Sequence, residues 1–241
     1  MINYFSTKFQ GGRAALAITR GLLATCAVLA ASGTAFTQER QEKQDKKEEL
    51  YFNFLPNPTT PTAITPPVGN VLFLAGHALG SQGYVCLPLG SGVSWTVNNA
   101  RPEATLFASV FGEPVQIITH FLSPDTNPNE NAPSPLAFAN ATWQSSFDTS
   151  KVWAQTVHFI VAGTDPSSCS HANSIPCLLL QSIGNAEGPT GGKLLANATF
   201  VQRLNTQGGV APATGCSVAG DVGKQTLVPY SADYYFFHRE E

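Results

Sequence analysis

The chain has 241 residues, enough for one compact domain with its own hydrophobic core. Only 12% of the residues are charged, and the formal net charge is −3. Residues 50–241 carry 11 acidic and 6 basic side chains, with no cluster of Lys or Arg. Because neutralisation of phosphates dominates nucleic-acid affinity, this composition argues against a nucleic-acid partner, and an acidic membrane surface is an equally poor partner.

Residues 1–35 have the pattern of an export signal. Lys8, Arg13 and Arg20 form a basic leader, and the apolar run at 21–35 ends in small residues. A spanning helix needs roughly 20 apolar residues, so this run favours a cleaved signal over a membrane anchor. We therefore expect a mature protein without a membrane span that is secreted, either extracellular or periplasmic.

Residues 36–50 are predicted to form a disordered linker. Between Gln38 and Glu49 the sequence QERQEKQDKKEE mixes both charges and contains no apolar side chain. Such a segment cannot bury enough apolar surface to offset the entropy lost on ordering. The remainder, residues 51–241, is predicted to be one β-rich domain.

Short apolar runs, separated by clusters of Gly, Pro, Asn, Ser and Thr, predict strands and turns in this domain rather than helices. The predicted strands are 71–75, 83–87, 92–97, 104–111, 115–122, 152–161, 176–181, 198–204 and 232–238. The pattern indicates an all-β fold, either an antiparallel sandwich or a barrel-like single domain. The glycine-rich stretch at 79–83 is interpreted as a turn that enters the second strand.

Two predicted loops are long and rich in proline. The segment 50–70 contains five prolines, too many for a central strand, and we expect it to lie extended across the domain. The segment 123–139 is polar, and a connection of this length inside a compact domain is usually functional or disordered.

Four cysteines remain outside the signal, and in an exported chain an even number indicates disulfides. Of the three possible pairings we predict Cys86 with Cys216 and Cys169 with Cys177. The first bond restricts the unfolded chain most, and the second closes a small loop. A zinc site that includes His171 is the alternative, but no Cys-x-x-Cys spacing supports it. We predict no metal and no other cofactor.

Several segments together carry a resemblance to a known family. They are GYVC at 83–86, PEATLF at 102–107, the His-Phe pair at 120–121, IPCLLL at 175–180, VQRLNTQGGVAP at 201–212 and VPYSADYYF at 228–236. Over residues 65–238 the chain resembles the secreted family of bacteria and filamentous fungi catalogued as domain of unknown function 3455. The resemblance implies an exported β-rich domain. The family has no established activity, so no catalytic residue is carried over.

Four side chains are candidates for ligand binding. His77 and His120 are predicted at strand ends, where they could share a metal or a general-base site, although no close His pair defines a ligand geometry. The planar guanidinium of Arg203 could hold a carboxylate or a sulfate. Tyr234 precedes Tyr235, and in a strand the two rings face opposite sides, so one is exposed or lies at a pocket rim.

Structural roles compete with these functional ones. A lone His in a strand is more often a buried, hydrogen-bonded residue than a ligand. Arg203 could instead pair with Asp233 or Asp148, while Asn205 closes the turn before two glycines. Asp148 and Asp165 are explained by turn formation.

No catalytic motif is complete. The sequence LGSQG at 79–83 misses the spacing of a serine-hydrolase nucleophile by one residue, and no acidic pair stands out as a glycosidase site. We therefore favour a non-enzymatic extracellular binding or surface module. Its unidentified ligand could be a glycan, because tryptophans and tyrosines are available for stacking, and Asn140 and Asn197 begin glycosylation sequons. The alternative is a secreted hydrolase or metal-dependent enzyme that uses His77 and His120.

Overall fold

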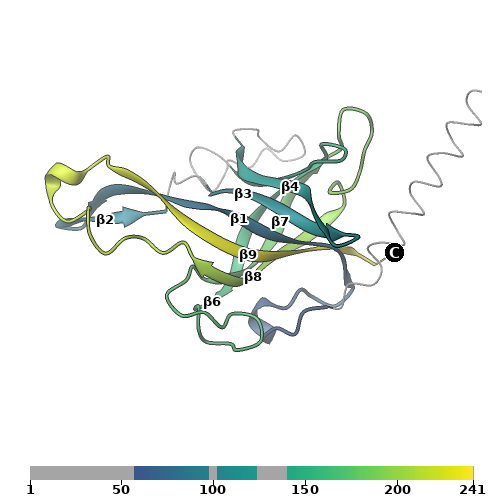
Figure 1. Cartoon of the computed structure of the whole chain (residues 1–241), viewed down its shortest axis with the longest axis horizontal. Helices are drawn as coiled ribbons and strands as arrows, with labels where there is room; N and C mark the ends of the chain where they lie inside the picture. The colour runs from purple at the N-terminus through teal and green to yellow at the C-terminus, as the bar shows by residue number, and fades with distance from the viewer. Residues whose placement is uncertain (1–56, 98–101, 124–139, 241) are drawn as a thin grey trace, which may run out of the picture. The chain divides into compact units, whose positions relative to one another are not determined.

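Nine strands form one antiparallel sheet in the computed structural model, which describes residues 57–97, 102–123 and 140–240 (Figure 1). The predicted signal at 1–35, the predicted linker at 36–50 and nearly all of the loop at 123–139 lie outside the described residues. The strands are β1 (Asn70–Leu89), β2 (Gly92–Thr96), β3 (Pro102–Val110), β4 (Glu113–Ser123), β5 (Asn140–Ser145), β6 (Lys151–Ile160), β7 (Cys177–Ala186), β8 (Ala198–Gly208) and β9 (Gln225–Arg239). The predicted all-β class is confirmed.

The sheet closes into a ring. Strands β3 to β9 follow one another in chain order, and β9 then pairs with β1, which also pairs with β3. Of the two predicted architectures the chain therefore adopts the barrel-like one. Beyond Gln82, β1 pairs only with β2 and β9, and these three strands form an arm that extends from the ring (Figure 1).

The predicted turn at 79–83 is wrong, because the predicted strands 71–75 and 83–87 are parts of the single strand β1. The glycines there mark close packing rather than a turn. A Cβ on Gly80 would lie 2.1 Å from the carbonyl oxygen of Glu103, and a Cβ on Gly76 would lie 2.9 Å from Cδ1 of Ile117. Glycine inside a strand often marks such a close approach.

Strand β5 was not predicted from the sequence, and β6 departs from regular alternation. In β5, Trp143 is the only large apolar side chain, so the strand gives a weak periodic signal. In β6 the register shifts after Trp153 and again after Thr156. Val157 and Ile160, which lie three residues apart, therefore both pack against the smaller core.

Two cores hold the domain together. The larger one fills the ring. The smaller one lies on the outer face of β7 and β8, where Ile64 packs with Cys169, Cys177, Leu179 and Leu204. Ile64 ends a short 3₁₀ turn, Thr62–Ile64, in the proline-rich segment. The described part of that segment thus crosses the outside of the sheet, as expected, and contributes one buried anchor.

Both predicted disulfides are present. Cys86 bonds to Cys216 with a Cα–Cα distance of 5.5 Å, and Cys169 bonds to Cys177 with a Cα–Cα distance of 6.0 Å. These bonds leave the four sulfurs unable to act as thiolate ligands. No group of three or more His, Cys, Asp or Glu side chains suited to a metal ion occurs in the described ranges.

Candidate functional site

The sheet separates the two histidines of the predicted site. His77 in β1 is exposed on the outer face, whereas His120 in β4 is 3% exposed and lies inside the ring. His120, Arg203 and Tyr234, in contrast, come together on the inner face. Arg203 and Tyr234 are cross-strand partners of β8 and β9, and the ring centroids of His120 and Tyr234 are 5.6 Å apart.

Inside the ring, His120 is held by one hydrogen bond and one stacked ring. Its Nδ1 donates to the carbonyl oxygen of Thr142 at 2.8 Å, and its ring stacks on Trp143 with a centroid distance of 4.2 Å. Burial lowers the pKa of His120 from 6.5 to about 4; the bond to Thr142 opposes this shift, and the positive charge of Arg203 adds to it. The imidazole is therefore neutral near pH 7, with its proton on Nδ1.

Arg203 does not pair with either acid proposed from the sequence. Its Nε and Nη2 both donate to the carbonyl oxygen of Pro176, at 3.3 Å and 2.9 Å. Asp233 lies on the outer face, where His77 and Asn205 bind it. Asp148 is engaged in its own turn, and it accepts hydrogen bonds from the backbone and hydroxyl of Ser150.

Three tyrosines, Tyr84, Tyr230 and Tyr234, lie near Arg203. The hydroxyls of Tyr230 and Tyr234 lie 3.1 Å apart and share a hydrogen bond, and Tyr84 donates to the carbonyl oxygen of Gly209. Burial raises the pKa of both Tyr230 and Tyr84, so both hydroxyls keep their protons. Tyr235 faces the opposite side of β9 from Tyr234, as the strand alternation predicted, but its ring is half-buried against the smaller core rather than exposed.

A second group of polar side chains lies on the outer face around His77. Its Nδ1 and Oδ1 of Asp233 are 2.8 Å apart, and Asn205 donates to the other carboxylate oxygen at 2.8 Å. Asn205 has a φ of +48° at a register shift between β8 and β9, which is a conformation that Asn tolerates better than most residues. This arrangement orients an imidazole, but within the described ranges no hydroxyl or thiol is hydrogen-bonded to His77.

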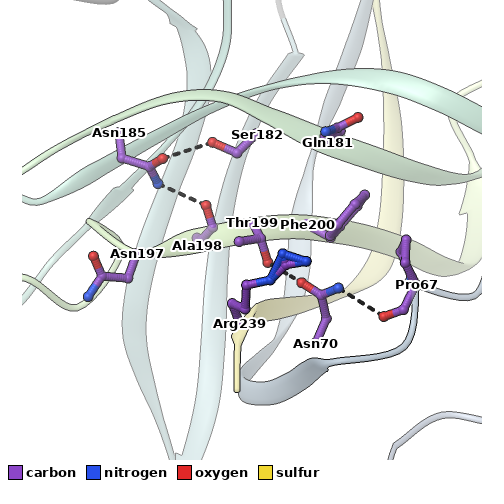
Figure 2. A pocket seen from close by; sticks show the side chains of 10 residues that line it. All are labelled: Pro67, Asn70, Gln181, Ser182, Asn185, Asn197, Ala198, Thr199, Phe200 and Arg239. Carbon is purple, nitrogen blue, oxygen red and sulfur yellow. Dashed lines mark hydrogen bonds between the residues drawn. The ribbon is translucent and has the colours of Figure 1, made fainter. Parts of the chain in front are cut away.

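A groove of about 420 Å³ lies where β7 and β8 separate, and sequence reasoning did not find it (Figure 2). The two strands pair from Leu178 to Gln181 and then diverge. The lining residues are Pro67, Asn70, Gln181, Ser182, Asn185, Asn197, Ala198, Thr199, Phe200 and Arg239. Four carboxamides, two hydroxyls and one guanidinium thus face one concave surface, with no carboxylate or imidazole in this lining.

Part of this lining is fixed by internal hydrogen bonds. Asn185 crosses the gap between the strands and donates to the carbonyl oxygens of Leu195 and Ala198, and Thr199 donates to Oδ1 of Asn70 at 2.6 Å (Figure 2). Gln181, Asn197 and Arg239 are exposed, and their side chains form no hydrogen bond with the described residues. Only the sequon at Asn197 could have drawn attention to this surface from the sequence.

No described helix has the length and apolarity required to cross a membrane. No curated protein and no solved structure matches the chain. A family model described as Protein of unknown function (DUF3455) matches residues 67–238, a range that includes both disulfides and nearly all of β1 to β9. Because this match spans well over half of the sequence, the chain belongs to the DUF3455 family, as its sequence motifs indicated.

Proposed function

We propose that this domain is an exported, non-enzymatic binding module that holds a carbohydrate in the groove between β7 and β8. The observation that carries the proposal is the chemistry of the lining, because six of the ten residues around a volume of about 420 Å³ carry carboxamides or hydroxyls. A carboxamide both donates and accepts hydrogen bonds, as a sugar hydroxyl does. Concave surfaces with a few well-placed polar groups are the usual form of a ligand site.

Some residues of the lining are held by internal hydrogen bonds, and others can form hydrogen bonds with a ligand. Asn70, Asn185 and Thr199 are held by internal hydrogen bonds and shape the groove. Gln181 and Asn197 keep their hydrogen-bonding capacity for a ligand. Arg239 is the charged residue of the lining, so the groove is expected to prefer a sugar that carries a carboxylate, such as a uronic acid.

Binding without cleavage fits this lining better than hydrolysis. Glycoside hydrolysis generally needs two carboxyl groups on either side of the scissile bond. The lining of this groove includes carboxamides but no carboxylate. Export is supported by the two disulfides, since such bonds persist in oxidising compartments, and by the signal-like residues 1–35.

One observation favours a second function, hydrolysis at the outer face. The contact between His77 and Asp233 resembles the pair that orients a general base in hydrolases. A nucleophile or an activated water would have to complete it. Without a nucleophile or an activated water, a structural role explains the contact between His77 and Asp233 equally well. In that role the contact stabilises the register shift of β8 next to Asn205.

Calorimetry with neutral oligosaccharides and with uronic acid oligosaccharides tests the binding function. Gln181→Ala is expected to weaken the binding of both ligand classes about fivefold, the effect of one net hydrogen bond. Arg239→Gln should weaken the binding of acidic ligands selectively. Gln207→Ala is the matched control, because Gln207 is an exposed amide of β8 outside the groove.

Two results would contradict the proposal. One is the absence of binding by either ligand class, and the other is equal affinity of the Gln181→Ala and Gln207→Ala variants. Product analysis of the bound oligosaccharide separates the two functions. Recovery of the intact ligand supports a binding module, whereas cleavage that disappears in His77→Ala would establish the hydrolase instead.

A further inference from the structure

The inner face of the arm beyond the ring is covered by residues 209–224. Cys86 in β1 bonds to Cys216 of this segment, and the indole Nε1 of Trp95 in β2 donates to the carbonyl oxygen of Thr214 at 3.0 Å. Cys86 is fully buried under this cover. The disulfide therefore ties the arm to the covering segment through its inner face.

The outer face of the arm carries a row of apolar side chains. Leu79 and Leu89 of β1 and Leu227 of β9 are 55%, 67% and 60% exposed. Val85 and Leu87 lie between the two leucines of β1 on the same side, because alternate residues of a strand share a face. These five residues form a surface that we call the arm face.

The strands of the arm also carry no charge. Residues 79–89, 92–96 and 225–231 contain no Asp, Glu, Lys, Arg or His. Charged side chains, Lys above all, are a usual protection of exposed strands against association. Glu103 of β3, the cross-strand partner of Ser81, borders the arm face at its ring end. Exposed apolar surface without charge is typical of a contact with another protein.

We propose that the arm face packs on the arm face of a second copy of this chain and forms a two-fold dimer. A two-fold contact is self-complementary, and an uncharged apolar face meets its own copy without repulsion between like charges. Because the arm extends from the ring (Figure 1), antiparallel stacking of two arms leaves the two rings at opposite ends. The same arrangement keeps the two Glu103 carboxylates apart.

The size of the arm face agrees with a weak dimer. From Leu79 to Leu89 strand β1 spans about 34 Å, and with its neighbouring strands the face is about 10–14 Å wide. Two such faces, packed as two sheets, bury about 800–1,000 Å² in total, which is at the lower end of specific interfaces. We therefore expect a dissociation constant of the dimer in the micromolar range.

Sedimentation equilibrium of the chain with both disulfides intact tests this dimer, at protein concentrations from about 1 to about 500 μM, which bracket a micromolar Kd. The expected result is a reversible equilibrium between monomer and dimer. Added salt should not weaken it, because the arm face has no charges to screen.

Leu227→Lys should weaken the dimer at least about a hundredfold. Leu227 is opposite Gly83, near the middle of the arm face, so the two introduced lysines would meet at the two-fold axis. Val218→Lys is the matched control and should leave the Kd unchanged. Val218 is also 60% exposed, but it belongs to the segment over the inner face.

A mixture of two charged variants tests the two-fold arrangement. Leu227→Lys and Leu227→Glu should each be monomeric alone, and their equimolar mixture should form a dimer, because opposite charges then meet at the axis. Both variants should keep the Tm of the wild-type monomer, since Leu227 is exposed. Leu227→Lys should also bind oligosaccharides in the groove normally, which keeps this test separate from the carbohydrate test.

Three results would overturn the proposal. The first is a monomer at every concentration. The second is a dimer that Leu227→Lys and Val218→Lys weaken equally, or a mixture of the two Leu227 variants that stays monomeric, since the contact would then lie elsewhere or lack the two-fold axis. The third is a monomeric wild type that co-sediments with phosphatidylcholine vesicles while Leu227→Lys does not, which would assign the arm face to a lipid surface.

Discussion

At the scale of single residues, His120 shows how the interior of the ring alters the chemistry of a side chain. The sequence left it open whether His120 is a ligand, a base or a structural residue. The structure stacks its ring on Trp143 and binds its Nδ1 to Thr142. Because burial opposes the charged form, the ring is held neutral over a wider range of pH than a free histidine.

This neutral histidine predicts a specific pH dependence of stability. The pKa of His120 is about 4 in the folded chain and 6.5 when the chain unfolds, so the unfolded state binds the proton more readily. The folded state keeps its full stability above pH 6.5 and loses about 3 kcal/mol between pH 6.5 and pH 4. The free energy of unfolding in urea, measured at half-unit steps of pH, checks this loss.

His120→Asn isolates this effect from the other titrating groups. The asparagine amide can still donate to Thr142, but it does not titrate, so the loss of stability between pH 6.5 and pH 4 should become smaller by about 3 kcal/mol. If wild type and variant show parallel curves over this range, the burial of a neutral His120 is refuted.

At the scale of elements, the proline-rich segment before β1 acts as a strap on the outside of the sheet. Its proline content excluded a central strand, and the structure shows what it does instead. Ile64 is fully buried against the disulfide between Cys169 and Cys177, and its carbonyl oxygen accepts a hydrogen bond from Gln202. Burial of this one side chain therefore anchors an otherwise irregular segment.

Truncation of this anchor should destabilise the domain. Ile64→Ala is expected to lower the free energy of unfolding by about 3 kcal/mol, because it leaves a cavity in the smaller core. Val68→Ala is the control, since Val68 lies in the same segment and is fully exposed, and it should change stability by less than about 0.5 kcal/mol. Equal urea midpoints for the two variants would show that the strap does not support the fold.

At the scale of the whole molecule, closure of the ring and the disulfides join parts of the chain that are distant in sequence. Strand β1 lies early in the domain and β9 ends it, yet they pair along almost their entire lengths. Cys86 and Cys216, separated by 130 residues, bond in the arm beyond the ring, whereas Cys169 and Cys177 are separated by only 8. The covalent link between Cys86 and Cys216 persists on unfolding and closes a long loop, so it restricts the unfolded chain strongly.

The two disulfides should therefore differ in their effect on stability. From the entropy of loop closure, replacing both Cys86 and Cys216 by Ala should cost about 5 kcal/mol, and replacing both Cys169 and Cys177 about 2.5 kcal/mol. Chemical denaturation of the two double variants measures the difference. A larger loss for the Cys169 and Cys177 pair would mean that packing in the smaller core outweighs chain entropy.

The sequence by itself determined the features that depend on local patterns. Short apolar runs between turn residues predicted the β-rich class and most strands, and an even number of cysteines in an export context led to both disulfides. These signals are local because side chains alternate along a strand and because turns need particular residue types.

Only the tertiary structure decided where side chains meet. Gly80 was interpreted as part of a turn, because no local pattern shows that the backbone of Glu103 will pack against it. His77 and His120 face opposite sides of the sheet, while Arg203 joins Tyr234 inside the ring. The groove arises where β7 and β8 diverge. Pairing between strands that are distant in sequence sets all of these positions. The local patterns that predict the strands do not show which strands will pair.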